Sequence, residues 1–459
     1  ARPGCIVSRM FLPSGLLMSY QSISPRRHRH LARDYLTNRS AKANPLNSYE
    51  LDVKGWAQTS VSRMQDHCSR LLETAINPPM LGEAIKDIGR KKLIGDDLQS
   101  NNPKGLPWYW LRELNKRVLS NEYRVGKYKK CRIPKPGKSG VRTIEVPGRD
   151  ARVLARSLCN VLTPILDPHF YPLSIGFRPK RCPTHGLAAA KLLCSQNKLH
   201  VVTCDIQNAF GMIPKKRMLE ILSSRLHQSN AMGLIEELLI PSRKKGIPQG
   251  ISISPLCMNV YLDHWFDHWF TKMFPGAVLV RYADDIAVFC DSRESAKHCF
   301  SAIQKRISSL GMKIKESVDE AVSDLASGDD VSWLGFRLRW RREGLQFSLN
   351  DLTWARLEIN FQEIVAQEGG QETSRDDLES TGFQWMTQKA LGVQREQIPQ
   401  IAEQVRETAS QFHLDMSRFT DEQATIAWNT GQRLAQEAEL DVQVFDSRLA
   451  KPPLDTVAL

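Results

Sequence analysis

Two adjacent aspartates, Asp284 and Asp285, stand in a short polar turn between two apolar runs, Val278–Val280 and Ile286–Cys290. Runs of this length and composition predict β-strands, so the carboxylates would lie at the tip of a hairpin. Neighbouring anions repel each other, and carboxylates close to a hydrophobic core are costly unless a cation compensates them. The pair therefore predicts a cation-binding site, and the alternative interpretation is a solvated, aspartate-rich hairpin turn.

A third aspartate favours the cation-binding interpretation. Asp205 ends the apolar run Val201–Cys204, which predicts another strand. Carboxylate oxygens are hard ligands that suit Mg²⁺. Two such ions, about 3.5–4 Å apart, can activate a hydroxyl nucleophile and stabilise a leaving pyrophosphate in an in-line displacement. This chemistry requires the Asp205 strand to lie beside the Asp284 hairpin in one sheet.

The segment Gly246–Pro255 lies between these aspartates and reads Gly-Ile-Pro-Gln-Gly-Ile-Ser-Ile-Ser-Pro. Gly250 permits a close backbone approach, and Ser254 followed by Pro255 predicts the start of a helix. Taken alone, the segment predicts a loop-to-helix junction and no particular chemistry.

Hydrophobic periodicity predicts the elements that would position these residues. The order of strands and helices from His200 to about Trp340 predicts a small mixed sheet packed on two helices. Residues 1–48 are expected to be mostly irregular, and the sequence beyond Asn350 to be helical with a break near Gly369–Gly370. Helical spacing covers Val61–Ile76, Leu81–Arg90, Trp108–Leu119, Val153–Leu166, Lys216–Arg225, Leu256–Phe270 and Ser295–Ser309, and hairpins are expected at Tyr128–Pro147 and from Val331–Arg339.

Charge divides the chain near residue 350. The first 350 residues carry 54 Lys and Arg against 31 Asp and Glu, whereas the remainder carries 9 against 19. A basic body of this size is typical of a phosphate-binding protein, and an inert charged surface is the alternative. The acidic remainder makes a domain boundary near residue 350 plausible.

Cysteine usage and hydropathy indicate a reduced cytosolic setting. The ten cysteines include no Cys-x-x-Cys pair, which argues against a zinc site and against a secreted disulfide framework. No apolar run approaches the roughly 18 residues of a membrane span, so no membrane association is expected. The first 33 residues contain no acid and several Arg and His, which favours a disordered basic arm and leaves organelle targeting as an alternative.

Taken together, the motifs resemble those of reverse transcriptases of bacterial retroelements, with the group II intron type the most similar. The resemblance covers roughly residues 123–340, the fingers and palm of such an enzyme. Six motifs in the same order are very improbable by chance, although each alone would be weak. They are Ile133–Lys135 with Arg142, Gly176–Arg178, Asp205–Phe210, Pro248–Pro255, Tyr282–Asp285 and Leu334–Phe336.

The resemblance implies two Mg²⁺ ions, for which Mn²⁺ could substitute. Asp205, Asp284 and Asp285 would hold these ions as catalytic residues, with the carbonyl of Ile206 as a further oxygen ligand. The substrates implied are dNTPs, an RNA template and a DNA or RNA primer.

The resemblance also implies a nucleotide-binding set. Lys135 and Arg142, on opposite arms of the fingers hairpin, would clamp the triphosphate, where cations neutralise charge that builds up in the transition state. Without the motif order they are two of many surface cations. Gln249 would lie in the nucleotide pocket. The residues implied to contact the template backbone are Gly176, Phe177 and Arg178.

Two aromatic positions carry further implications. Phe210 resembles a steric gate that closes off space for a ribose 2′-hydroxyl, which favours deoxynucleotides, and a core Phe is the alternative. Trp333, Leu334 and Gly335 resemble a primer grip, with Gly335 allowing close approach to the primer strand. Trp333 and Phe336 could equally be ordinary core residues.

The sequence departs from the family in three places. Relatives commonly carry Glu-Lys-Thr after the palm helix, with a lysine that protonates pyrophosphate. Here no lysine falls in register, and Lys313 or Lys315 would be mere substitutes. The aspartate usual after the gate aromatic is Gly211. The acidic tail resembles neither a maturase region nor an endonuclease, so autonomous intron mobility is not expected.

We therefore expect an α+β fold, a right-hand polymerase whose palm has a mixed sheet packed on helices. Its parts would be a basic, partly irregular extension with helices over residues 1–95, fingers over 96–200, a palm with the catalytic aspartates over 201–345, and a helical thumb-like, acidic region over 346–459.

The function implied is an RNA-directed DNA polymerase in a retroelement-derived or antiviral defence setting, in the bacterial cytoplasm. The alternative is a non-polymerising RNA-binding protein, such as a splicing helper, built on a palm scaffold. Further expected partners are a cognate non-coding or intron RNA, and a protein bound through the acidic C-terminal region.

Overall fold

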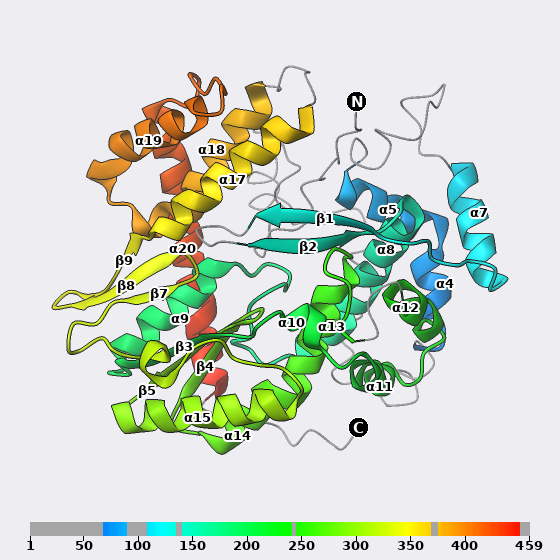
Figure 1. The fold of residues 1–459 in the computed structure, drawn as a ribbon, viewed down its shortest axis with the longest axis horizontal. Helices are drawn as coiled ribbons and strands as arrows, with labels where there is room; N and C mark the ends of the chain where they lie inside the picture. Colours follow the sequence, from blue (N-terminus) through cyan, green and yellow to red (C-terminus); the bar gives the residue numbers. More distant parts are fainter. Residues whose placement is uncertain (1–67, 90–107, 135–139, 241–244, 369–374, 450–459) are drawn as a thin grey trace, which may run out of the picture.

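The computed structural model describes residues 68–89, 108–134, 140–240, 245–368 and 375–449 (Figure 1). The α+β class is confirmed, with helices around three small antiparallel sheets. The predictions for residues 1–67 and 90–107 and for the break at Gly369–Gly370 lie outside the described residues.

The first group of helices surrounds one long apolar helix, α8 (Arg149–Leu166). Its neighbours α4 (Leu71–Ile76), α5 (Pro78–Ile88) and α7 (Trp108–Leu119) follow the predicted periodicity. The predicted hairpin is present as β1 (Lys129–Pro134) and β2 (Val141–Val146), paired antiparallel. Figure 1 shows this hairpin across the middle of the molecule.

A four-stranded sheet lies at the centre of the core. Its order is β4 (Val278–Tyr282), β5 (Asp285–Cys290), β3 (His200–Asp205) and β6 (Val322–Asp324). The expectation of a mixed sheet was wrong, because every pair of these strands is antiparallel. The three apolar strands β3, β4 and β5 are buried by α9 (Pro183–Ser195) and α15 (Arg293–Ser309).

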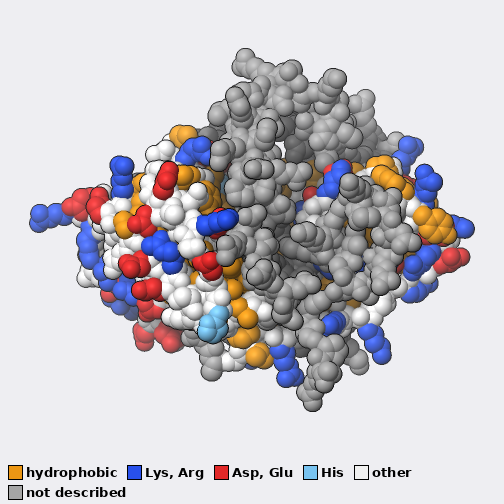
Figure 2. Space-filling model, turned by 90° about the horizontal axis from the view of Figure 1, so that it is seen from above, with side chains coloured by type: hydrophobic (Ala, Val, Ile, Leu, Met, Phe, Trp, Pro, Cys, Tyr) orange, Lys and Arg blue, Asp and Glu red, His pale blue; other side chains and the backbone are white. Residues whose placement is uncertain are grey.

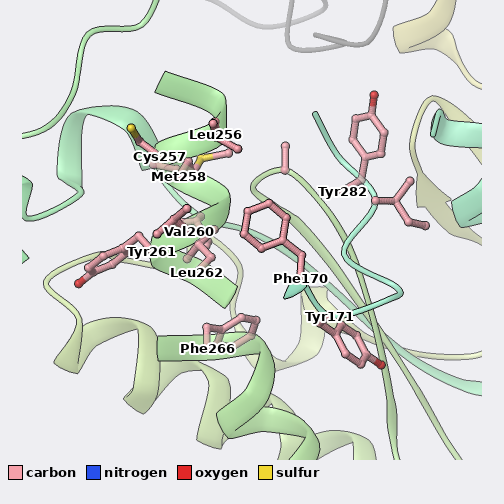
Figure 3. Close-up of a cluster of buried hydrophobic side chains, with 14 of the residues drawn as sticks. Phe170, Tyr171, Leu256, Cys257, Met258, Val260, Tyr261, Leu262, Phe266 and Tyr282 are labelled. Carbon is pink, nitrogen blue, oxygen red and sulfur yellow. The ribbon is translucent and has the colours of Figure 1, made fainter. Parts of the chain in front are cut away.

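The helix expected over Leu256–Phe270 is interrupted. It begins as α13 (Ile253–Leu262), passes through a π-helical turn at Asp263–Asp267 and ends as α14 (His268–Met273). The helix also starts earlier than predicted, which places Ser254 inside its first turn and not at its N-cap. Figure 3 shows the apolar side chains of this segment packed beside Phe170 and Tyr171.

The chain beyond residue 330 forms a small sheet and a helical group. The sheet consists of β7 (Val331–Trp333), β8 (Phe336–Arg341) and β9 (Gly344–Leu349). Remaining helices are α10 (Ala209–Met212), α11 (Lys215–Arg225), α12 (Met232–Leu239), α16 (Val318–Ala321), α17 (Asp351–Glu368), α18 (Arg375–Lys389), α19 (Ile398–Ser410) and α20 (Asp421–Leu449), with single 3₁₀ turns at Asp167–His169, Ala390–Gly392 and Arg395–Gln397.

The described residues bury two hydrophobic cores. The first runs from Cys68 to Leu345, and the second is built from α17 to α20. The long helix α20 belongs to both, because Ala438 and Val442 join the first core while Ala424 and Ala427 join the second. The predicted division of the first core into fingers and palm stays a prediction.

The surface is charged on the face seen from above (Figure 2). Lys and Arg side chains lie on both flanks of this face, with Asp and Glu side chains among them on the left flank. Within the ranges that the structure describes, none of the helices combines the length and the apolar character needed to cross a membrane.

Candidate active site

The three predicted aspartates meet at one end of the central sheet. Asp205 and Asp285 are opposite residues of the β3–β5 pair, which places their Cα atoms about 4.5–5.5 Å apart. The backbone N–H of Ile206 donates to the carbonyl of Asp284 at 3.1 Å. The Asp205 strand therefore lies beside the Asp284 hairpin in one sheet, which is the arrangement that two-metal chemistry requires.

The turn that carries Asp284 is held in an unusual backbone conformation. Ala283 has a φ of 60°, in the left-handed region, which is uncommon for alanine. Gly176 lies directly behind this turn, because a Cβ at Gly176 would be 2.1 Å from the Ala283 nitrogen. Asn259 Nδ2 donates to the Gly176 carbonyl at 2.8 Å and fixes that contact. Only glycine fits at residue 176.

A buried ion pair supports the same turn. Arg281 donates to Asp267 through Nε at 2.8 Å and through Nη2 at 2.6 Å, and both side chains are fully buried. Arg281 Nη1 also donates to the Ala283 carbonyl at 2.8 Å. This pair belongs to none of the predicted site residues, although an arginine inside an apolar strand is a signal that a buried acid must accompany it.

The carboxylates of the cluster have different surroundings. Burial raises the pKa of Asp284, although the positive charges of Arg142 and Arg281 act to lower it. The carboxylate of Asp205 forms an ion pair with the ammonium of Lys315. The Asp205 backbone N–H donates to Glu316 Oε2 at 3.0 Å. A cation therefore already neutralises the first of the three aspartates.

The donor set suits a hard divalent cation, although its side chains are not gathered around one point. Within the described parts of the chain, no three His, Cys, Asp or Glu side chains are arranged to hold a metal ion. The Asp205 carboxylate is instead paired with the ammonium of Lys315. The Lys315 side chain is 43% exposed, so it can leave without disturbing the core.

Arg142 approaches the aspartates from the β1–β2 hairpin. Burial lowers the pKa of Arg142 on β2, the charges of Asp284 and Asp285 raise it, and Arg356 on α17 lowers it. Arg142 thus lies within electrostatic range of both carboxylates, as well as of Arg356. Its predicted partner Lys135 lies outside the described residues.

The predicted loop Pro248–Pro255 docks on the hairpin. The Glu145 backbone N–H on β2 donates to the Gln249 carbonyl at 2.7 Å. Gly250 permits this contact, because a Cβ there would be 2.2 Å from the Glu145 carbonyl oxygen. Gln249 is therefore half-buried at the junction of the hairpin and the central sheet.

The predicted gate residue stands against another aromatic. Phe210 is half-buried on α10, and its ring meets that of Phe177 edge to face, with centroids 6.1 Å apart. Close by, Gly246 contacts the backbone of Gly211, since a Cβ at Gly246 would be 2.6 Å from the Gly211 carbonyl oxygen. The glycine in place of the family's usual aspartate therefore lies at a tight backbone crossing.

Arg178 differs from the expectation of a template contact. Its side chain is buried, with the whole residue 4% exposed, and Nε donates to Asp167 Oδ1 at 2.7 Å. Nη1 donates to the carbonyls of Tyr171 and Ser174, both at 2.9 Å. Because these internal acceptors engage its guanidinium, Arg178 braces the loop that carries Gly176, which is itself buried.

The segment expected to grip the primer forms a tight turn. Leu334 and Gly335 have φ values of 52° and 86°, and Trp333 pairs with Phe336 across them. Two positive φ values in a two-residue hairpin turn are typical of type I′. Trp333 is buried, and its indole N–H has no hydrogen-bond partner among the residues described.

Two cations that the sequence motifs did not indicate, Lys389 and Arg356, lie beside this turn. The ammonium of Lys389, at the end of α18, lies 4.7 Å from the centre of the Phe336 ring, and a Cβ at Gly335 would be 3.0 Å from it. Burial, and after it the charge of Arg356, lowers the pKa of Lys389 to about 7. Neither cation belongs to a motif, and both lie in an acidic part of the sequence, so no sequence signal marked them.

Comparison with known proteins identifies the central segment. Residues 133–338 match the family described as reverse transcriptase (RNA-dependent DNA polymerase). The chain is 26% identical over 228 residues to Protein YkfC of Escherichia coli (strain K12), which covers 46% of this chain and 58% of that protein. It is 25% identical over 209 residues to the Putative COX1/OXI3 intron 2 protein of Saccharomyces cerevisiae, covering 42% of this chain and 24% of that protein.

Among solved structures, a likeness is found to the Partial Cas6-RT-Cas1--Cas2 complex, with 18% identity, a TM-score of 0.30 and coverage of 52% of this chain and 41% of that one. The chain spans less than two thirds of the length of the curated relatives it matches. Residues 133–338, with the three aspartates at the end of paired strands, are therefore a domain of the reverse transcriptase family.

Proposed function

We propose that the chain is an RNA-directed DNA polymerase, which adds deoxynucleotides to the 3′-hydroxyl of a primer on an RNA template. The observation that carries this proposal is the direct pairing of Asp205 with Asp285, with Asp284 beside them and Arg142 facing them. Three aspartates thus share one end of the sheet, within electrostatic range of an arginine, which supports a site for phosphoryl transfer.

The three aspartates and the Ile206 carbonyl would hold two divalent cations, Mg²⁺ or Mn²⁺. When bound, these ions activate the primer hydroxyl and neutralise charge on the leaving pyrophosphate. For this, Lys315 releases the Asp205 carboxylate. Its exposed ammonium then stays next to the site, where it can donate a proton to pyrophosphate. Lys315 would thus donate the proton to pyrophosphate, the role that relatives give to a lysine at a different position.

The substrate nucleotide would be bound from the fingers side. Arg142 binds the triphosphate, together with Lys135, and Gln249 borders the base and sugar. Phe210 and Phe177 form an aromatic wall whose edge-to-face contact limits the room beside the sugar. This wall supports a preference for dNTPs over ribonucleotides.

The primer strand would lie along the turn at Leu334 and Gly335. Arg356 and Lys389 converge there without belonging to the aspartate cluster, and two cations beside a tight turn suit a phosphodiester. We propose a retroelement-derived or antiviral defence setting, with a cognate RNA and a protein partner at the acidic C-terminal region. Similarity to an intron protein supports the retroelement origin.

Primer extension on an RNA template with Mg²⁺ and dNTPs tests the proposal. We expect product from the wild type and at least a 100-fold loss with Asp284→Ala, because the carboxylate has no substitute. Asp330→Ala serves as a control, since its ion pair with Arg339 is on the surface. No extension by the wild type with Mg²⁺ or Mn²⁺, or full activity of Asp284→Ala, would refute the proposal.

A second candidate is an RNA-binding protein that does not polymerise. It is favoured by one observation, the ion pair between Lys315 and Asp205, which could neutralise the site permanently. The variant Lys315→Met distinguishes the two. A polymerase should then reach half-maximal activity at a lower Mg²⁺ concentration, whereas an RNA-binding scaffold should keep its RNA affinity and show no extension with any metal.

A further inference from the structure

A second cluster of titratable side chains lies at the N-terminus of α9, outside the aspartate site. Cys182 is half-buried, whereas the other eight cysteines in the described ranges are buried. Its Sγ lies 3.4 Å from Nδ1 of His185, and Nε2 of His185 lies 3.4 Å from Oδ2 of Asp441. Asp441 comes from α20, so the cluster joins two elements more than 250 residues apart in sequence.

The hydrogen bonds order this cluster for proton transfer. The Cys182 backbone N–H donates to His185 Nδ1 at 3.3 Å, which makes Nδ1 an acceptor and leaves the proton on Nε2, facing Asp441. Nδ1 has one lone pair, so it takes the thiol proton when the long contact from the backbone N–H opens, and the carboxylate of Asp441 stabilises the imidazolium that results. The thiolate lies at the N-terminus of a 13-residue helix, where an anion is favoured.

A buried hydroxyl without a partner lies within electrostatic range of the sulfur. Tyr282 is 4% exposed, and its hydroxyl has no hydrogen-bond partner among the described residues. The charge of Cys182 acts on this hydroxyl. Figure 3 shows this hydroxyl directed away from the apolar cluster. A thiolate would supply the acceptor that the hydroxyl lacks.

The balance of charges favours the thiolate. Burial raises the pKa of Cys182, but the hydrogen bonds and charge of His185, with Thr184, outweigh it, so the pKa of Cys182 lies below its usual range. The groups that face the cluster are His185 on α9, Asp441 on α20 and Tyr282 on β4. The charges of Asp285 and Arg356 also act on the Tyr282 hydroxyl.

We propose that Cys182 is a reactive thiolate, activated by His185 and Asp441, and that it is a modification site for small disulfides and soft electrophiles. With a disulfide RSSR, the Cys182 sulfur attacks one sulfur, a new S–S bond forms and the old one breaks. The released thiolate RS⁻ takes the proton held by His185. The disulfide's oxidation level passes to the Cys182–SSR adduct, and no further oxidant is needed.

The position of the cysteine couples an adduct to polymerisation, a step that rests on the proposed function. One turn along α9, a Cβ at Gly186 would be 2.8 Å from Leu334 Cδ1, and Tyr282 leads directly into the turn that carries Asp284. An adduct at Cys182 would therefore disturb elements that lead to the aspartate turn and to the turn at Leu334 and Gly335. We expect it to slow primer extension.

Alkylation of the full-length chain tests the reactive site without reference to polymerisation. In a Cys5→Ser background, because Cys5 lies outside the described residues, iodoacetamide should label Cys182 first. The rate should rise to half its maximum at a pH below the ordinary value of about 8.5. Peptide mapping by mass spectrometry identifies the labelled residue at each pH.

Variants of the two supporting residues separate activation from folding. His185→Ala should slow labelling at pH 6.5 at least tenfold. Asp441→Asn should move the pH profile upward, and Asp441→Glu should restore it. Glu439→Gln is the matched control, because it removes the neighbouring ion pair between α20 and α9, Lys191 with Glu439 at 2.7 Å, and should leave the profile unchanged. Labelling of Cys182 with an ordinary thiol profile, or labelling of a buried cysteine first, would overturn the proposal.

Treatment with oxidised glutathione tests the modification itself. We expect one mixed disulfide per chain, absent from Cys182→Ser and reversed by dithiothreitol, with at least a fivefold loss of primer extension that Cys182→Ser escapes. A mixed disulfide with unchanged extension would refute the coupling while supporting the reactive site. A wild type without any polymerase activity would refute the proposed function, and the mass shift would still decide the reactive site.

Discussion

The buried ion pair between Arg281 and Asp267 provides a sharp test of what holds the aspartate turn. Removing one partner with Asp267→Ala leaves the guanidinium of Arg281 without its anion, at a site where both side chains are fully buried. Breaking a buried pair in this way costs about 3–5 kcal/mol of unfolding free energy. The loss should exceed that of any exposed pair in the chain.

Asp330→Ala is the matched control. Asp330 also accepts hydrogen bonds from both branches of an arginine, Arg339, but the two side chains are 34% and 41% exposed. Water compensates the loss of such a pair, so its removal should cost about 1 kcal/mol or less. The two variants therefore differ in burial and hardly in the geometry of the pair.

Urea unfolding followed by tryptophan fluorescence gives the free energies. A double variant, Arg281→Met with Asp267→Leu, should recover most of the stability, because apolar groups of similar volume can replace a buried pair. It should nevertheless lose primer extension, since no side chain then donates to the Ala283 carbonyl. If Asp267→Ala costs no more than Asp330→Ala, or if the double variant polymerises normally, the role given to this pair is wrong.

Three further predictions concern pH and substrate choice. Burial raises the pKa of Asp263, but His268 and Arg225 lower the pKa by more, so its value is about 2. The stabilisation that ionised Asp263 gives to the fold is therefore complete above pH 4 and is lost as the pH falls to 2. The difference in unfolding free energy between wild type and Asp263→Asn should shrink by about 2 kcal/mol between pH 5 and pH 2, and a constant difference would contradict this. Because Lys389 is half-neutral at pH 7, affinity for a primer–template should fall by up to about tenfold per pH unit above 7, and Lys389→Met should abolish that dependence in fluorescence anisotropy. Phe210→Ala should raise ribonucleotide incorporation, measured as the ratio of dNTP to rNTP use, and an unchanged ratio would show that the ring only packs against Phe177.

The strands and the aspartate cluster were predictable because their signals are local. The run before Asp205 and the two runs around Asp284 are apolar throughout, and strands buried on both faces must pair with each other. The motif order then fixed which acids would meet. The antiparallel pairing of β4 with β5 follows from the tight turn between them, whereas that of β3 with β5 was not predictable, because a long connection allows either direction.

The direction of long cationic side chains could not be predicted. Arg178 occupies a motif position, yet Asp167 and two carbonyls turn its guanidinium inward. Conversely, Arg356 and Lys389 belong to no motif and reach the turn at Gly335 from the acidic part of the chain. A sequence pattern specifies where a residue lies along its strand or helix, whereas the reach of a four-carbon side chain depends on neighbours that are distant in sequence.

Because α20 contributes side chains to both hydrophobic cores, the two cores share a single continuous element. Loss of that helix would expose apolar surface on both sides at once. The free energies of the two cores are thereby linked, and thermal or chemical denaturation should proceed as one cooperative transition and not as two. The central sheet and the helices α17 to α20 are then parts of one folding unit, in spite of the reversal of charge between them.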